Sequence, residues 1–324
     1  MTTATAPGKI ILFGEHAVVY GQPAIAVPVT QVQAKVDVDD SPRPGVWVHA
    51  PDVNLHEELS RLAPGHPLGE AIRSVFSALR VPPPSSADRK EVNGKGGLAI
   101  TITSTIPVAS GLGSGAAVSV ALIRSLSAHL GHPLPDEQVS ALTYEVEKIH
   151  HGTPSGIDNT VVTYAKPVYF VRGRDGEPPT IEVFPIARPF TIVIGDTGLP
   201  APTKEAVADV RRLWEADRTR MERLFAAIGS IVRAARQAIE EGHPERLGPL
   251  MDENHALLQE MTVSSPELDR LVEAARRAGA LGAKLSGGGR GGNMIALVEG
   301  GSASRVANAL REAGAQRGIV TTVG

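Results

Sequence analysis

Two glycine-rich segments constrain the fold of this chain more than any other feature. Residues 111–115 read GLGSG and residues 287–292 read GGGRGG, so the two segments hold eight of the 34 glycines. Glycine makes up about 10% of the chain against a typical ~7%. Glycine at this density suits a backbone that turns tightly or lies against a ligand. We therefore expect two functional loops between regular elements, and not flexible linkers.

The first glycine segment lies between a predicted strand, residues 98–106, and a predicted buried helix, residues 116–130. A glycine turn that enters a helix directs free N–H groups and the positive end of the helix dipole at one point, which suits an anion such as phosphate. A tight turn without any ligand explains the same glycines about as well. The sequence contains no G-x-x-x-x-G-K-[ST], which excludes a Walker A loop.

The second glycine segment satisfies the pattern G-x-G-x-x-G, but it leads into a predicted strand at residues 293–299. A dinucleotide-binding loop opens a helix instead, so a Rossmann fold is not expected. A simple hairpin needs only one or two glycines. Close approach of the backbone to a ligand explains the segment better, and Arg290 would add a cation to that surface.

The order of predicted elements indicates an α+β fold with two domains. The boundary falls in a Pro-rich stretch near residues 177–189, which gives an N-terminal mixed α/β domain (1–185) and a C-terminal split βαβ, ferredoxin-like domain with extra helices (186–324). Residues 41–97 are weakly patterned apart from one helix. Predicted strands span residues 10–14, 24–29, 31–38, 98–106, 168–173, 191–195, 283–286, 293–299 and 318–323. Predicted helices span residues 68–79, 116–130, 135–151, 203–242, 244–261, 266–278 and 302–313.

Composition excludes several classes of protein. Charged residues are 21% and apolar residues 42% of the 324 residues, unlike a disordered or fibrous chain. The formal net charge of -3, without a run of Lys or Arg, gives little support for binding nucleic acid or anionic membranes. Cysteine is absent, which excludes disulfides and a thiol nucleophile. The sequence has no apolar run of roughly 18 residues and no signal-peptide pattern, so we expect a cytoplasmic protein.

Two carboxylates are candidates for catalysis. Glu147 lies late on a predicted helix, and Asp158 follows a Gly/Pro turn. Next to a phosphate site, such a pair would supply one magnesium ligand and one proton acceptor. Two simpler explanations remain open, because Glu147 could be a solvated helix carboxylate and Ser155 with Asp158 has the spacing of a capping box.

The remaining polar candidates are also ambiguous from the residues alone. Glu147 and His150 form one E-x-x-H pair, whereas a di-iron bundle needs two. His150 and His151 lack a partner at zinc spacing, which leaves a helix end or a substrate contact. Lys9 could be a solvated edge lysine, and the Glu15–His16 pair could belong to a turn.

Taken together, the motifs resemble the GHMP kinase superfamily and, within it, the mevalonate kinases. The resemblance runs from residue 9 to residue 297, and five ordered segments carry it. They are KIILFGEHAVVYG (9–21), PVASGLGSGAAVS (107–119), HGTPSGIDN (151–159), DTGLPAPTKEAV (196–207) and KLSGGGRGGNMIAL (284–297).

The resemblance implies ATP-dependent phosphorylation of (R)-mevalonate at its C5 hydroxyl, with Mg²⁺ as the metal. It implies that Asp158 is the catalytic aspartate and that Lys9 lies beside it. Glu147 and Ser114 would bind the metal. The nucleotide would contact Pro107, Ala109, Ser110, Gly111, Leu112, Gly113, Ser114, Gly115, Ala116 and Arg290. Mevalonate would contact Glu15, His16, His151, Ser155, Thr203 and Gly288. Members of the family are often homodimers.

Four positions depart from the family's usual pattern. The second serine of GLGSSAA, commonly a magnesium ligand, is Gly115 here. The third motif usually reads GAGGGG, where this chain has Gly288 and Arg290, and Asn293 stands where cysteine is common. We expect Arg290 to contact the nucleotide phosphates.

Other activities fit the same ATP loops. They are a kinase for phosphomevalonate or homoserine, a decarboxylase acting on a mevalonate derivative, and a ligand sensor without catalysis. HGTPSGIDN argues against the other kinases, and retention of Lys9, Glu147 and Asp158 argues against the sensor.

Overall fold

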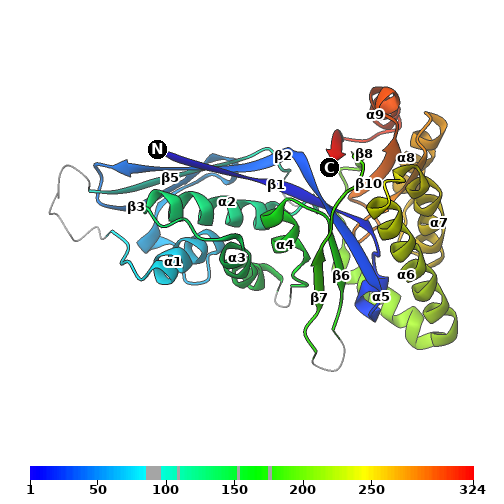
Figure 1. Cartoon of the computed structure of the whole chain (residues 1–324), viewed down its shortest axis with the longest axis horizontal. Helices are drawn as coiled ribbons and strands as arrows, with labels where there is room; N and C mark the ends of the chain where they lie inside the picture. Colours follow the sequence, from blue (N-terminus) through cyan, green and yellow to red (C-terminus); the bar gives the residue numbers. More distant parts are fainter. Residues whose placement is uncertain (85–95, 108–109, 152–153, 174–176) are drawn as a thin grey trace. The chain divides into compact units, whose positions relative to one another are not determined.

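The computed structural model describes residues 1–84, 96–107, 110–151, 154–173 and 177–324 (Figure 1). The chain forms two compact units, each made of segments that are separate in sequence. The first unit comprises residues 1–8, 32–107 and 113–165, and the second comprises residues 9–31, 108–112 and 166–324. Strands β1 (Thr2–Phe13) and β2 (Pro23–Ser41) contribute residues to both units and pair with each other.

The sheet of the first unit runs in the order β4-β3-β5-β2. Strand β2 is antiparallel to β5 (Gly97–Ser104), with Val36 opposite Ile102. From Val32 to Val38, alternate residues of β2 are buried, as the alternating sequence predicts for a sheet with one covered face. Strands β3 (Gly45–Ala50) and β4 (Leu55–Glu58) lie in the weakly patterned segment that was expected to contain only a helix. Both strands are short, and β4 lies at the edge of the sheet, so their hydrophobic signal is weak.

Four helices of the first unit lie together on one face of its sheet (Figure 1). The small, apolar residues of α2 are buried on several sides, because α2 packs against α1, α3 and α4. The three helices predicted in this region are confirmed as α1 (Pro67–Leu79), α2 (Ser114–His129) and α3 (Asp136–His151). The fourth, α4 (Ile157–Tyr164), was not among the predicted helices.

The second unit contains a four-stranded antiparallel sheet in the order β11-β8-β10-β9. All residues of the inner strand β10 are buried, so this strand lies within the hydrophobic core of the unit. The amino-terminal end of β2 also pairs with β6, and β6 with β7. The strands are β6 (Val168–Val171), β7 (Thr180–Val183), β8 (Phe190–Asp196), β9 (Gly282–Ser286), β10 (Asn293–Val298) and β11 (Arg317–Val323).

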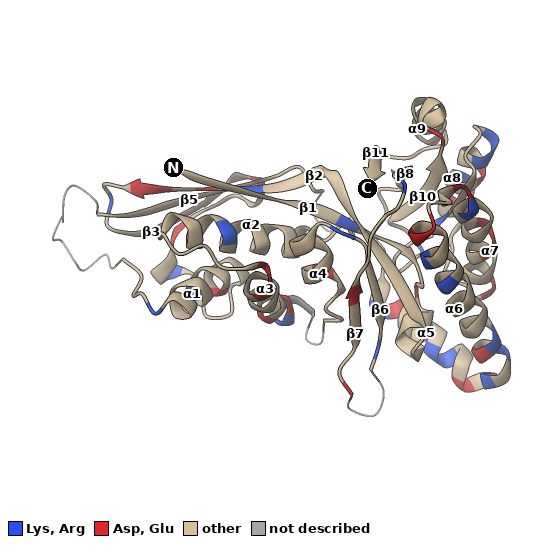
Figure 2. Ribbon diagram, in the orientation of Figure 1, with Lys and Arg blue, Asp and Glu red and all other residues tan. Residues whose placement is uncertain are grey.

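Helices of the second unit cover this sheet, with α7 and α8 packed on β9 and α9 packed on β8 and β11. The helix predicted over residues 203–242 is two helices, because the Asp217 side chain accepts the Arg220 N–H at 3.0 Å and starts a new helix. Acidic and basic residues are both present along α6 to α8 (Figure 2). The helices are α5 (Thr203–Ala216), α6 (Arg218–Glu240), α7 (Leu247–Glu260), α8 (Pro266–Arg277) and α9 (Ala303–Glu312).

Short 3₁₀ turns connect several elements. They are η1 (Ala17–Tyr20), η2 (Pro51–Val53), η3 (Leu59–Arg61), η4 (Pro244–Arg246) and η5 (Gly300–Ser302). The element order after residue 190 is strand, helices, strand, strand, helix, strand, which confirms the split βαβ pattern and the α+β class. Within the described ranges, no helix combines the length and the apolar character that crossing a membrane requires.

Candidate active site

The predicted site residues are divided between the two units. The first unit holds Pro107, Gly113, Ser114, Gly115, Ala116, Glu147, Ser155 and Asp158. The second unit holds Lys9, Glu15, His16, Ser110, Gly111, Leu112, Thr203, Gly288 and Arg290. Ala109 lies outside the described residues, as does the side chain of His151.

The glycine segment 111–115 ends at the amino terminus of helix α2. Gly113 adopts a left-handed backbone with φ 72° and precedes Ser114, the first helical residue. Gly113 has no side chain to cap the helix, so the first N–H groups of α2 have no partner from their own cap. Ser114 is half-buried and Gly115 is exposed. This end of α2 therefore presents backbone donors and a positive dipole to a solvent-accessible anion.

The preceding residues of the same loop are held within the second unit. The Lys9 N–H donates to the Leu112 carbonyl at 2.9 Å, and the Asn293 side-chain amide donates to the Ser110 carbonyl at 2.6 Å. Gly111 is exposed and has φ 76°. The loop is thus attached at both ends of a three-residue segment. Sequence reasoning missed Asn293 as an anchor of this loop, and its position in place of the common cysteine was the only signal.

The two candidate carboxylates lie on adjacent helices of the first unit. Glu147 is buried on α3 with 3% exposure, whereas Asp158 is half-buried in the first turn of α4, and α3 packs against α4. Ser155 accepts the Ile157 N–H through its Oγ at 3.2 Å, but the N-cap of α4 is Gly156, without a side-chain cap bond, so Ser155 is not the cap residue that the capping-box spacing suggested. Burial of Glu147 argues against a merely solvated helix carboxylate.

In the second unit, the segment after β1 makes a tight turn that buries Glu15 and His16. Gly14 has φ 99°, and a Cβ at this position would lie 2.5 Å from the Ala24 Cα, so no larger residue fits. His16 Nε2 lies 3.0 Å from the Gly288 carbonyl. Burial lowers the pKa of His16, although the bond to Gly288 raises it. The ring is therefore neutral near pH 7, with Nε2–H donating to Gly288 and Nδ1 carrying the lone pair.

Lys284 lies in the middle of β9 and is wholly buried. Its ammonium forms an ion pair with Glu15 Oε1 and donates to the Leu285 carbonyl at 2.6 Å. Burial lowers the pKa of Lys284, and the Glu15 carboxylate raises it. Sequence reasoning missed this residue. The available signal was a single lysine among apolar residues in the strand that leads into the glycine run.

The glycine run 287–292 packs closely on two other segments of the second unit. A Cβ on Gly288 would lie 2.5 Å from Thr203 Oγ1 at the start of α5, and one on Gly289 would meet the Val263 carbonyl. Arg290 has φ 60°, and its N–H donates to Val263. Its guanidinium pairs with Asp209 of α5. These glycines therefore allow close packing within the unit, whereas approach of this run to a ligand remains a prediction.

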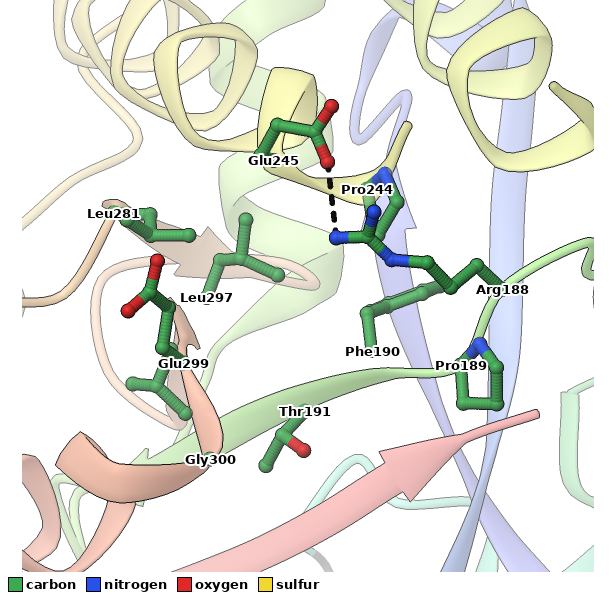
Figure 3. Close-up of a pocket in the computed structure, with 11 residues that line it drawn as sticks. Arg188, Pro189, Phe190, Thr191, Pro244, Glu245, Leu281, Leu297, Glu299 and Gly300 are labelled. Carbon is green, nitrogen blue, oxygen red and sulfur yellow. Dashed lines mark hydrogen bonds and ion pairs between the residues drawn. The ribbon is translucent and has the colours of Figure 1, made fainter. Parts of the chain in front are cut away.

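A separate hollow of about 310 Å³ opens beside β8 and β10 (Figure 3). Arg188 and Glu245 form an ion pair of 3.1 Å across it, above apolar residues such as Leu281 and Leu297. Its lining includes no residue of the five motifs except Leu297, the last residue of the third motif. Within the described part of the chain, no group of three or more His, Asp or Glu side chains is arranged to bind a metal.

Comparison with known proteins matches both halves of the chain to one superfamily. The description "GHMP kinases N terminal domain" matches residues 84–166, and "GHMP kinases C terminal" matches residues 235–316. Mevalonate kinase of Pyrococcus furiosus is 38% identical, over 96% of this chain and 93% of the relative. Mevalonate kinase of Thermococcus gammatolerans is 39% identical, over 96% and 93%. The crystal structure of L. major mevalonate kinase in complex with R-mevalonate superposes with a TM-score of 0.82 at 30% identity, covering 100% of this chain and 96% of that chain.

Proposed function

The chain belongs to the GHMP kinase superfamily and, within it, to the mevalonate kinase family, and from this premise we propose that it transfers the γ-phosphoryl group of ATP to the C5 hydroxyl of (R)-mevalonate. The product is 5-phosphomevalonate, an intermediate of isoprenoid biosynthesis. The observation that carries the proposal is similarity to named mevalonate kinases along nearly the whole length of both chains.

Phosphoryl transfer demands positioning and charge neutralisation more than covalent chemistry from the protein. We propose that Asp158 accepts or orients the proton of the attacking hydroxyl. Lys9, nearly buried at 9% exposure, stabilises the negative charge that develops on the reacting oxygens. The position of Asp158 in the first turn of α4 supports this role, because the helix holds the carboxylate on a regular element.

The nucleotide phosphates are proposed to bind the loop from Pro107 to Ala116. The open amino terminus of α2 and the anchored segment 110–112 support this assignment, because both present backbone to an anion. Arg290 is proposed to contribute a cation to the same phosphates. The guanidinium of Arg290 pairs with Asp209. To contact the phosphates, it must bind them together with Asp209 or in place of Asp209.

Glu147 and Ser114 fit a magnesium site by their donor chemistry, since Mg²⁺ is bound by one or two carboxylates together with substrate phosphates and water. Glu147 supplies a buried carboxylate, and Ser114 supplies a hydroxyl at the start of α2. When bound, the metal would neutralise phosphate charge. Because Gly115 replaces the family's usual second serine, this chain has one hydroxyl fewer at that turn.

Mevalonate is proposed to contact Glu15, His16, His151, Ser155, Thr203 and Gly288. The close packing of Gly288 on Thr203 and the bond from His16 to Gly288 support a common location for three of these residues. We also propose residues 1–185 and 186–324 as the two kinase domains, a cytoplasmic location and a homodimer. Analytical ultracentrifugation of the purified protein tests the homodimer.

A phosphorylation assay with a panel of acceptors tests the function directly. Purified protein, ATP and Mg²⁺ are combined with mevalonate, phosphomevalonate, homoserine or galactose, while ADP and carbon dioxide are measured. ADP release with mevalonate alone is expected. Preference for another acceptor assigns a sister kinase, release of carbon dioxide assigns a decarboxylase, and failure to turn over any acceptor assigns a sensor.

A further inference from the structure

The ion pair between Lys284 and Glu15 is buried more deeply than stability requires. The side chains are 0% and 1% exposed, and 269 residues separate them in the sequence. Removing two charges from water costs free energy that their attraction only partly returns, and apolar residues of similar size often serve stability as well. A pair at this depth, beside the proposed substrate residues, therefore calls for a functional explanation.

Two hydrogen-bond acceptors next to this pair remain unfilled. Glu15 Oε2 and His16 Nδ1 are both buried, and neither has a hydrogen-bond partner in the part of the chain that the structure describes. Buried polar atoms in proteins are nearly always hydrogen-bonded. Two acceptors on consecutive residues point to a ligand that brings donors, and hydroxyl groups are the donors of a hydroxy acid.

The contacts around Lys284 fix how Glu15 is presented. Ser286 Oγ donates to the Ile11 carbonyl at 2.7 Å, which ties β9 to the end of β1 next to the pair. The following turn is fixed by His16, which has φ 59° and bonds to Gly288. With the backbone held on both sides, the ammonium of Lys284 decides which Glu15 oxygen is occupied and which is left open.

We propose that Lys284 is a positioning residue of the acceptor site, binding Glu15 Oε1 so that Glu15 Oε2 and His16 Nδ1 accept hydrogen bonds from the substrate's hydroxyl groups. The inference rests on the proposed function, since it takes a hydroxy acid as the acceptor. The positive charge of Lys284 also cancels the negative charge of Glu15, so an anionic substrate meets no net negative charge at this point. Lys284 acts through Glu15 and does not touch the substrate.

Steady-state kinetics of Lys284→Met, Lys284→Arg, Glu15→Gln and the double variant Lys284→Met/Glu15→Gln test the inference. Lys284→Met should raise KM for the acceptor about tenfold or more while KM for ATP changes by less than about twofold. Lys284→Arg should recover part of the loss, because it retains the charge. The double variant should match Glu15→Gln, because Lys284 then has nothing to position. Lys166→Met, at an exposed lysine of the same unit, is the matched control and should leave both KM values unchanged.

An acceptor KM near the wild-type value in Lys284→Met, or an equal rise in both KM values, overturns the inference. Lys284→Met leaves Glu15 buried and unpaired, so circular dichroism melting is recorded for each variant. If Lys284→Met does not fold, Glu15→Gln and the double variant decide. The inference is supported if the acceptor KM rises above the wild-type value by the same factor in Glu15→Gln and in the double variant. It is overturned if Glu15→Gln has the wild-type KM, or if the double variant has a higher KM than Glu15→Gln.

The wild-type panel separates this inference from the proposed function. If the wild type prefers another hydroxyl acceptor, the proposed function fails, but the same variants are measured with that acceptor. If the wild type turns over no acceptor, both statements fail together.

Discussion

The side-chain amide of Asn293 donates a 2.6 Å hydrogen bond to the main-chain carbonyl of Ser110. This bond joins the first residue of β10 to the proposed phosphate loop, across 183 residues of sequence. A bond from a strand to this loop limits how far the loop moves.

Replacing Asn293 with Ala is therefore expected to raise KM for ATP about fivefold, the equivalent of one hydrogen bond of about 1 kcal/mol. KM for mevalonate should stay unchanged. Asn308→Ala, at an exposed asparagine on α9, is the matched control. Equal KM values for ATP in both variants would show that the bond does not organise the loop.

Gly288→Ala is expected to raise KM for mevalonate about tenfold or more, because small displacements of binding groups are costly. The new Cβ would lie 2.5 Å from Thr203 Oγ1 and 3.1 Å from the Thr203 Cα, so α5 would have to shift. The family's common alanine is thus not interchangeable with glycine in this chain. Gly300→Ala, where a Cβ meets nothing within 4 Å, serves as the control. An unchanged KM in Gly288→Ala contradicts the placement of Thr203 in the acceptor site.

Asp158→Asn is expected to lower kcat by roughly 10²- to 10⁴-fold, as for loss of a general base. The shape of the side chain is kept, and loss of a charge in the first turn of α4 should cost only about 0.3–1 kcal/mol of stability. Glu137→Gln removes an exposed acidic residue from the first turn of α3 and should leave kcat unaltered. Full activity in Asp158→Asn would refute the proposed role.

Arg290→Ala is expected to raise KM for ATP, because it removes the cation proposed to contact the phosphates. Arg290→Gly is the control for backbone strain. It also removes the cation, but glycine adopts the left-handed backbone of φ 60° at this position without strain. Asp209→Asn releases the guanidinium from its ion pair but keeps the cation, so KM for ATP should not rise. An unchanged KM for ATP in Arg290→Ala would remove Arg290 from the nucleotide site.

We expect the free energy of unfolding to decrease as the pH falls below neutrality, because of His255. Burial lowers the pKa of His255 from 6.5 to about 4, although the neighbouring Asp269 raises it. The unfolded chain therefore binds a proton as the pH falls through 6.5, while the folded chain binds one only near pH 4. The free energy of unfolding should drop across this interval, by on the order of 3 kcal/mol from this group.

Urea unfolding between pH 4 and pH 7 measures this dependence in the wild type and in His255→Gln. In His255→Gln, the free energy of unfolding should depend less steeply on pH, since the variant has no imidazole to protonate at this position. His132→Gln replaces an exposed histidine and should keep the full slope. Identical slopes in all three proteins would mean that His255 does not govern the acid response.

Hydrophobic periodicity and glycine placement were enough to predict the α+β class, most of the helices and the two glycine-rich loops. These signals are local, because a buried strand or helix repeats its apolar residues within a few positions. Strands β3 and β4 were missed because they are short, with six and four residues. The break between α5 and α6 was missed because one N-cap at Asp217 interrupts an otherwise continuous helical pattern.

The sequence alone thus determined the order of motifs and the chemistry available in them: backbone amides, carboxylates and lysines, without a thiol. Only the tertiary structure decided which of these groups meet. The pairing of Lys284 with Glu15 and the bond from Asn293 to Ser110 join segments far apart in the chain. Such contacts depend on strand register and on how loops pack onto the sheet, and a single sequence carries no local signal for either.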